Sequence, residues 1–165
     1  PSRSMASLCA AGTRSDGAAH VEVIGNRPGT SWVLDWFAAE DRVRTYRTIV
    51  IDPVSGANSL VSDLRNLGLQ IVEVGTRQMV AGCGKFYDLA TQGRLRHIDQ
   101  VPLNAAVAGS KKRNLGDARA WHRRDNSVDV SPLVAATLAL QAHVAPELRP
   151  QGTPQLVDPW SMTDE

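Results

Sequence analysis

A run of β-branched residues near the middle of the chain passes directly into turn residues and then into a helical pattern. The run covers Thr48 to Ile51 and stops at Asp52-Pro53. Four such positions in succession are typical of a strand covered on both faces. Asp52 then lies where a buried strand emerges, which is where α/β sheets place ligands. Because Asp is a favoured capping residue, capping of the helix that starts near Gly56 is the alternative role.

The pattern before this strand predicts a hairpin and a helix. One strand covers Arg3 to Ala11, and a second covers His20 to Ile24 after a turn at Asp16-Gly17. Thr30 or Ser31 then caps a helix that runs to about Arg44.

The pattern after this strand predicts a strand-helix-strand unit. A helix from about Gly56 to Asn66 ends at Gly68, and a strand follows from Leu69 to Val74. We expect the two strands that flank this helix to pair with each other in parallel.

The second half of the chain is predicted to be mainly helical. The expected elements are a helix over 78–91, an extended piece over 95–98, a helix over 101–108, an irregular strand over 118–124 and a helix over 131–144. For the last helix, Ser131 is the expected cap and Pro132 the first helical position. This helix is apolar on all sides, so we expect it to be buried.

The length of 165 residues suits one domain, which we place at 1–145. The remainder, 146–165, carries four prolines without periodicity and is predicted to be an extended or disordered tail. No apolar run is long enough to span a bilayer, and the N-terminus lacks the apolar core of a signal peptide. We therefore expect no membrane association and a cytoplasmic location.

Positive charge is concentrated in one part of a chain whose formal net charge is only +1. The segment between Arg94 and Arg124 contains eight Lys and Arg residues and only two acids. Such a cluster is typical of a protein that binds a polyanion, although a solvated basic face is the alternative. The residues that we expect to contact nucleic acid are Lys111, Lys112, Arg113, Arg119, Arg123 and Arg124.

Two kinds of chemistry find no support in the sequence. Cys9 and Cys83 lie far apart, without the spacing of a zinc site or a disulfide framework. Gly84-Lys85 is followed by Phe86 where a phosphate-binding loop needs Ser or Thr, so nucleotide hydrolysis is not indicated.

Three acids are candidate metal ligands. Asp52 ends the central strand, and Asp129 precedes the last helix, with Asp125 four residues earlier. Carboxylates that converge from distant positions bind hard divalent cations. Two such ions about 4 Å apart would hold the attacking and leaving oxygens of a phosphodiester in line. Asp129 alone is also well placed as an acid at a helix start.

Several longer stretches resemble one family. They are TIVIDPVSGA, GLQIVEVGTRQM, GRLRHIDQVPLNAAV and AWHRRDNSVDVSPLVAATLAL. They resemble the C-terminal nuclease domain of tailed-phage terminase large subunits, particularly those of actinobacterial phages and prophages. The similarity runs from Ser2 to His143. It implies an α/β fold with a ribonuclease H-like mixed sheet flanked by helices.

The resemblance also implies an activity and its partners. The domain is expected to be an endonuclease that cuts concatemeric double-stranded DNA during packaging by two-metal hydrolysis, with Mg²⁺ or Mn²⁺. The expected partners are DNA, the portal protein and the small terminase subunit. The ATPase domain of the family is absent from this sequence.

The family uses three acids, of which Asp52 matches the second and Asp129 the third, with Asp125 as an alternative or auxiliary ligand. The first acid would lie upstream of Pro1, since Asp16 is too far along the chain to replace it. The expected alternatives are therefore an active nuclease, a catalytically incompetent module that docks on DNA or the portal, and a resolvase- or transposase-like nuclease. His97 and the tryptophans at 32, 36 and 121 are expected to be structural, and His122 either contacts DNA backbone or is an exposed strand residue.

Overall fold

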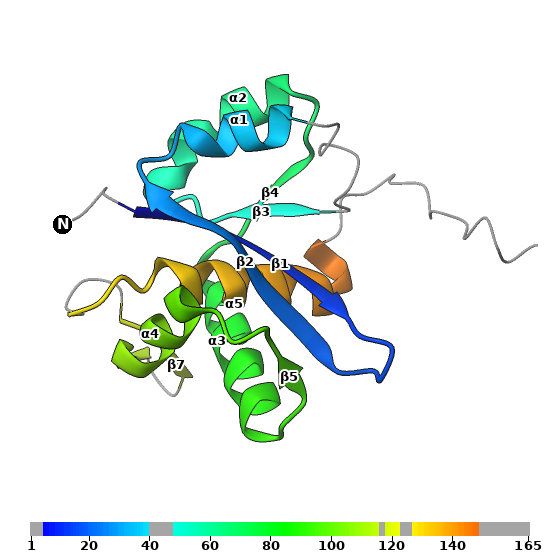
Figure 1. Cartoon of the computed structure of the whole chain (residues 1–165), viewed down its shortest axis with the longest axis vertical. Coiled ribbons are helices and arrows are strands. Elements are labelled where there is room, and N and C mark those ends of the chain that lie inside the picture. The colour runs from blue at the N-terminus through cyan, green and yellow to red at the C-terminus, as the bar shows by residue number, and fades with distance from the viewer. Residues whose placement is uncertain (1–4, 40–47, 116–117, 123–126, 149–165) are drawn as a thin grey trace, which may run out of the picture.

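The computed structural model describes residues 5–39, 48–115, 118–122 and 127–148, with the backbone alone for 113–115, 118 and 119. Helices cover both sides of a set of strands (Figure 1). In chain order the elements are β1 (Met5–Thr13), β2 (Ala19–Pro28), α1 (Trp32–Ala38), β3 (Ile49–Ile51), η2 (Gly56–Leu60), α2 (Val61–Asn66), β4 (Ile71–Glu73), α3 (Thr76–Thr91), β5 (Leu95–Arg96), α4 (Val101–Gly109), β6 (Lys112–Leu115), β7 (Ala118–Trp121), α5 (Ser131–Val144) and η3 (Pro146–Leu148).

The predicted hairpin is present as β1 and β2, which pair in an antiparallel register from Met5↔Pro28 to Thr13↔Ala19. The turn between them uses Gly17 at φ 80°, a conformation that glycine adopts without strain. β5 then pairs in parallel with β2, so this sheet has the order β1-β2-β5.

The strand-helix-strand unit is confirmed. β3 and β4 pair in parallel, with Ile49 opposite Ile71 and Ile51 opposite Glu73. The connection begins as the 3-10 helix η2 and continues as the α-helix α2, which ends before Gly68 at φ 85°. Parallel and antiparallel pairs therefore both occur, which confirms the predicted mixed α/β class.

Two elements of the structure differ from the prediction. α1 ends at Ala38 because Ala39 is extended (φ −80°, ψ 137°), whereas the pattern predicted a helix to about Arg44; residues 40–47 lie outside the described part. β6 was not predicted at all, and it pairs with β7 to form an antiparallel hairpin within the basic segment.

α5 is the central helix of the fold and packs against β1, β2, β3, α3 and α4. Leu133, Ala136 and Leu140 are fully buried in the larger hydrophobic core. Burial is not complete on all sides, as the apolar sequence had predicted, because Val134, Ala135 and Ala139 are only partly covered.

The chain remains folded a little beyond α5. η3 follows directly, and Leu148 packs into the larger core at 5% exposure. The structure thus differs from the predicted tail at 146–148, while residues 149–165 lie outside the described part.

Candidate metal and nucleic-acid site

A groove of about 1790 Å³ separates β1 from β3. Residues of both strands line it, together with residues of α1, α5, the segment 52–60 and the segment 128–130. Both Asp52 and Asp129 lie at this groove, together with Ser7, His122 and Ser131. The two acids therefore lie at one groove, while their shared role as metal ligands stays a prediction.

Asp52 lies at the carboxyl end of β3 and is only 5% exposed. Its Oδ1 accepts a hydrogen bond of 3.0 Å from the Val54 N–H, and its carbonyl accepts one of 2.7 Å from the Ser55 hydroxyl. Ser55, not Asp52, caps the following helix, since the Ser55 Oγ accepts a hydrogen bond from the Ala57 N–H. The helix-cap alternative for Asp52 is therefore wrong.

Asp129 precedes α5 and is exposed, and both of its carboxylate oxygens accept hydrogen bonds. Oδ1 accepts from the Ser131 N–H and Oδ2 from the Ser131 hydroxyl, each at 2.9 Å. The predicted cap residue is thus wrong by one position, because Ser131 is the first helical residue and Val130 is the N-cap. Asp129, one residue further out, accepts the Ser131 N–H. This interaction is favourable because a negative charge lies at a helix N-terminus.

Asn26 also contacts Asp129, and the sequence did not predict that Asn26 lies at this site. Its Nδ2 donates to Asp129 Oδ2 at 2.9 Å and to the Ser7 Oγ at 2.8 Å. Ser7 is its cross-strand neighbour on β1 and also lies 2.8 Å from the Ser131 hydroxyl. Because Asn26 follows Gly25, the pair has the sequence of a turn, and this concealed its position within β2.

The basic residues are only partly described. Lys111 and Lys112 are exposed, and the Lys112 ammonium lies 3.9 Å from the centre of the Tyr87 ring on α3. Arg113 and Arg119 belong to β6 and β7, but their side chains lie outside the described part. Arg123, Arg124 and the candidate ligand Asp125 lie outside it entirely.

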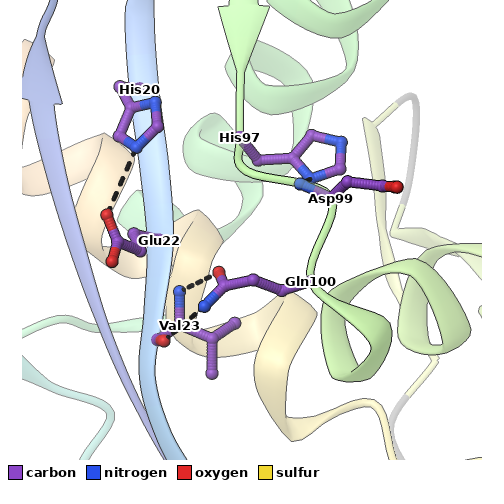
Figure 2. Close-up of polar contacts among 6 residues, drawn as sticks. All are labelled: His20, Glu22, Val23, His97, Asp99 and Gln100. Atoms are coloured by element: carbon purple, nitrogen blue, oxygen red, sulfur yellow. Dashed lines mark hydrogen bonds and ion pairs between the residues drawn. The ribbon is translucent and has the colours of Figure 1, made fainter.

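His97 makes a local contact in the loop between β5 and α4 (Figure 2). Its Nδ1 accepts a hydrogen bond of 3.1 Å from the Asp99 N–H, where Asp99 has φ 56°. In the same loop the Gln100 side chain bonds both backbone groups of Val23, each at 2.7 Å. This contact is local to the loop, and the structural role expected of His97 stays a prediction.

The tryptophans serve packing, as predicted. Trp121 packs edge-on against Phe86 and donates from its indole N–H to the buried Thr137 hydroxyl at 2.9 Å. Trp32 donates to the Gly29 carbonyl, and Trp36 contacts Phe37 at 4.9 Å between ring centres.

The donor chemistry at the groove fits a hard cation, because Asp52 and Asp129 offer carboxylate oxygens. The number of donors is smaller than a full ligand set. Within the described ranges, no three His, Cys, Asp or Glu side chains gather closely enough to hold a metal ion.

The fold is similar to that of two solved phage large terminase structures, and the predicted fold class, an α/β fold with a ribonuclease H-like mixed sheet flanked by helices, is confirmed. The HK97 bacteriophage large terminase superposes with a TM-score of 0.66 at 15% identity, over 86% of this chain and 40% of that one. The large terminase nuclease from thermophilic phage G20c, solved with bound magnesium, superposes with a TM-score of 0.54 at 10% identity, over 84% of this chain and 82% of that one.

This chain spans less than half of the HK97 protein. No family model matches the sequence, and no curated protein matches it either. None of the described helices is long and apolar enough to cross a membrane.

Proposed function

We propose that the chain is the nuclease domain of a phage terminase large subunit, which cuts double-stranded DNA with divalent metal ions. The supporting observation is that Asp52 and Asp129, from distant parts of the chain, line one groove in a fold shared with a magnesium-bound terminase nuclease. Mg²⁺ or Mn²⁺ ions held there would stabilise the attacking and leaving oxygens of the phosphodiester.

Each acid contributes differently to this site. Asp52 is fixed by the turn that follows β3, so its position is set by the sheet. Asp129 is oriented by Ser131, which bonds both of its carboxylate oxygens, and by Asn26, which donates to Oδ2. We assign Asp125 as a further ligand.

Basic side chains of one segment of the chain would hold the DNA backbone. The hairpin β6–β7 and its flanks carry the six cations Lys111, Lys112, Arg113, Arg119, Arg123 and Arg124. Contacts of this type act on phosphates and are independent of base sequence. We therefore expect non-specific cutting. The proposed function also implies the portal protein and the small terminase subunit as partners in the host cytoplasm.

Plasmid cleavage in Mn²⁺ tests the proposal. The chain is compared with a version extended at its N-terminus to carry an upstream acid, each with Asp52→Ala or Asp129→Ala. We expect the extended version to cut and both substitutions to abolish cutting. Asp16→Ala is the matched control, since Asp16 is an exposed acid in the β1–β2 turn, paired with Arg14, and its loss should leave the rate unchanged.

The second candidate is a module that binds DNA or the portal without cutting. It is favoured by the presence of only two carboxylates at the groove among the described residues. If the extended version binds DNA in gel shifts and never cuts, this second function replaces the first.

A further inference from the structure

Arg27, near the end of β2, is an exposed arginine that lies over an aromatic ring. Its guanidinium carbon is 5.2 Å from the centre of the Trp32 ring, which is a cation–π contact. Among the described residues, the ion pairs involve other side chains, and no carboxylate contacts Arg27. The guanidinium is therefore positioned by the ring, and its N–H donors remain available for an anion.

The Trp32 ring is itself fixed at two points. Its indole N–H donates a 3.1 Å hydrogen bond to the Gly29 carbonyl. Its opposite edge lies directly on the backbone of Gly25, where a Cβ would be only 2.7 Å from Cη2 of the ring. The position of the ring, and with it that of the guanidinium, is thus set by the backbone of β2 and of the loop that follows.

Arg27 lies next to the residue that holds a candidate metal ligand. The preceding residue, Asn26, donates the 2.9 Å hydrogen bond to Asp129 Oδ2. Because successive side chains of a strand point to opposite faces, Asn26 faces Asp129 and α5, whereas Arg27 faces α1. In Figure 1 α1 and α5 lie on opposite sides of the strands. Arg27 does not line the groove, so it lies beside the candidate metal site and not within it.

The anion that suits this position is a phosphate of the DNA backbone. The planar fork of an arginine can bind two oxygens of one phosphate. Each strand of B-DNA carries one phosphate about every 3.4 Å along its axis, so a duplex bound at Asp129 has further phosphates close by. We propose that Arg27, positioned by Trp32, binds a backbone phosphate next to the one that is cut. The inference rests on the proposed function, which brings DNA to Asp129.

This contact would be separate from the basic segment between Arg94 and Arg124, since it comes from β2. A phosphate contact of this kind adds affinity without reading the base sequence. The expected signature is therefore a weaker and less salt-dependent complex when the arginine is removed.

Binding of a fluorescein-labelled DNA duplex, measured by fluorescence anisotropy in EDTA, tests the inference without metal or cutting. Arg27→Gln removes the charge and the fork. We expect its Kd at 100 mM NaCl to rise about five- to tenfold, and the slope of log affinity against log salt to become smaller by about 1. Arg27→Lys should restore the slope but only part of the affinity, because it keeps the charge and loses the fork.

Arg14→Gln is the matched control, because it changes the net charge equally. Arg14 is exposed at the other end of the same hairpin and pairs with Asp16 at 3.4 Å. The eight residues of β2 between the two ends correspond to roughly 26 Å at about 3.3 Å per residue. This exceeds the screening length of about 10 Å at this salt concentration, so the Kd of Arg14→Gln should stay near that of the native chain. Thermal unfolding of both variants should show that each remains folded.

A third variant tests the role of the ring. Trp32→Leu keeps Arg27 and the net charge, and its binding is measured well below its own Tm. We expect its Kd to rise about two- to fivefold, which corresponds to an exposed cation–π contact, with an unchanged salt slope.

The inference is overturned if the native chain binds the duplex and Arg27→Gln has the same Kd and salt slope as Arg14→Gln. Native-like binding by Trp32→Leu also overturns it, because the guanidinium then needs no ring to position it. Neither result affects the proposed nuclease. A failure of the proposed nuclease would instead appear as duplex binding that depends on Arg27 without any cutting in Mn²⁺, and a chain that binds no DNA at all would contradict both.

Discussion

The side-chain amide of Asn26 on β2 donates a 2.9 Å hydrogen bond to Oδ2 of Asp129, the acid that precedes α5. The two residues are 103 positions apart in the sequence. The contact ties the β1–β2 hairpin to the start of the central helix and fixes one face of the candidate metal ligand.

Replacement of Asn26 by Ala should therefore weaken metal-dependent cleavage without unfolding the protein. Residues that orient a metal ligand typically contribute about 10–100-fold in metal affinity or activity. We expect the Mn²⁺ concentration for half-maximal plasmid cleavage by the extended chain to rise by about this factor. Asn66→Ala, at an exposed position at the end of α2, is the control and should not shift it. An unchanged Mn²⁺ dependence in Asn26→Ala would mean that the contact is only structural.

The two roles of Asp129 can be separated by two substitutions. Asp129→Asn keeps an oxygen that can accept from the Ser131 N–H but loses the charge and the Oδ2 acceptor of Asn26, so the free energy of unfolding should fall by less than in the Ala variant. Asp129→Ala removes the acceptor and should lower the stability by about 1 kcal/mol, the usual cost of a lost cap. Urea denaturation measures both. Both variants should lose cleavage, and equal stability of the two would contradict the capping role.

Two glycines of α3 should respond oppositely to replacement by Ala. A Cβ at Gly84 meets nothing within 4 Å, so Gly84→Ala should stabilise the helix by about 0.5–1 kcal/mol. A Cβ at Gly82 would lie 3.1 Å from the Cβ of Gln141 and 3.2 Å from Cγ2 of Thr137, both on α5. Gly82→Ala should gain less or lose stability, because α3 and α5 are pressed together there. Thermal unfolding of both variants tests this prediction. An equal rise in Tm for the two variants would contradict it, because α5 would then move to accommodate the Cβ at residue 82.

Cys9 should be an unreactive thiol. Burial raises its pKa from 9.0 to about 12, and its Sγ donates to the Pro132 carbonyl. At pH 8, DTNB should modify Cys9 at least roughly 100-fold more slowly than a free thiol, because the thiolate is the reactive form. Mass spectrometry of the labelled peptides distinguishes Cys9 from Cys83.

The same pKa shift makes stability depend on pH. The folded-state pKa lies above the unfolded value, so the contribution of Cys9 is complete below pH 9 and declines as the pH rises toward 12. The difference in stability between the native chain and Cys9→Ala should shrink over this range. A constant difference would contradict the shift.

The sequence predicted those parts of the fold that local pattern determines. The β-branched run before Asp52, the parallel pairing of β3 with β4 and the helix introduced by Pro132 all follow from periodicity and turn residues. Asp52 and Asp129 were selected because each lies at the end of a buried element. Both residues line one groove, which depends on tertiary contacts, and their role as metal ligands stays a prediction.

What the sequence did not reveal depends on contacts between distant residues. Asn26 has the sequence context of a turn, and only the pairing of β2 with β1 places it beside Asp129. The cap of α5 was assigned to Ser131 because Ser precedes Pro132. In the structure the helix already begins at Ser131, and the carboxylate of Asp129 accepts the N–H of Ser131. β6 was missed because a run of charged residues conceals its pairing with β7.

The Gln100 side chain has a consequence for the behaviour of the protein at high concentration. Its amide bonds the N–H and the C=O of Val23, on a strand whose parallel pairing with β5 spans only Ala19 and His20. Exposed strand edges promote aggregation, and proteins commonly protect them with charged residues, bulges or covering loops. Here a single glutamine imitates a strand partner, so a neighbouring molecule cannot dock its own backbone at Val23. One uncharged side chain thus protects this strand edge against pairing with another molecule.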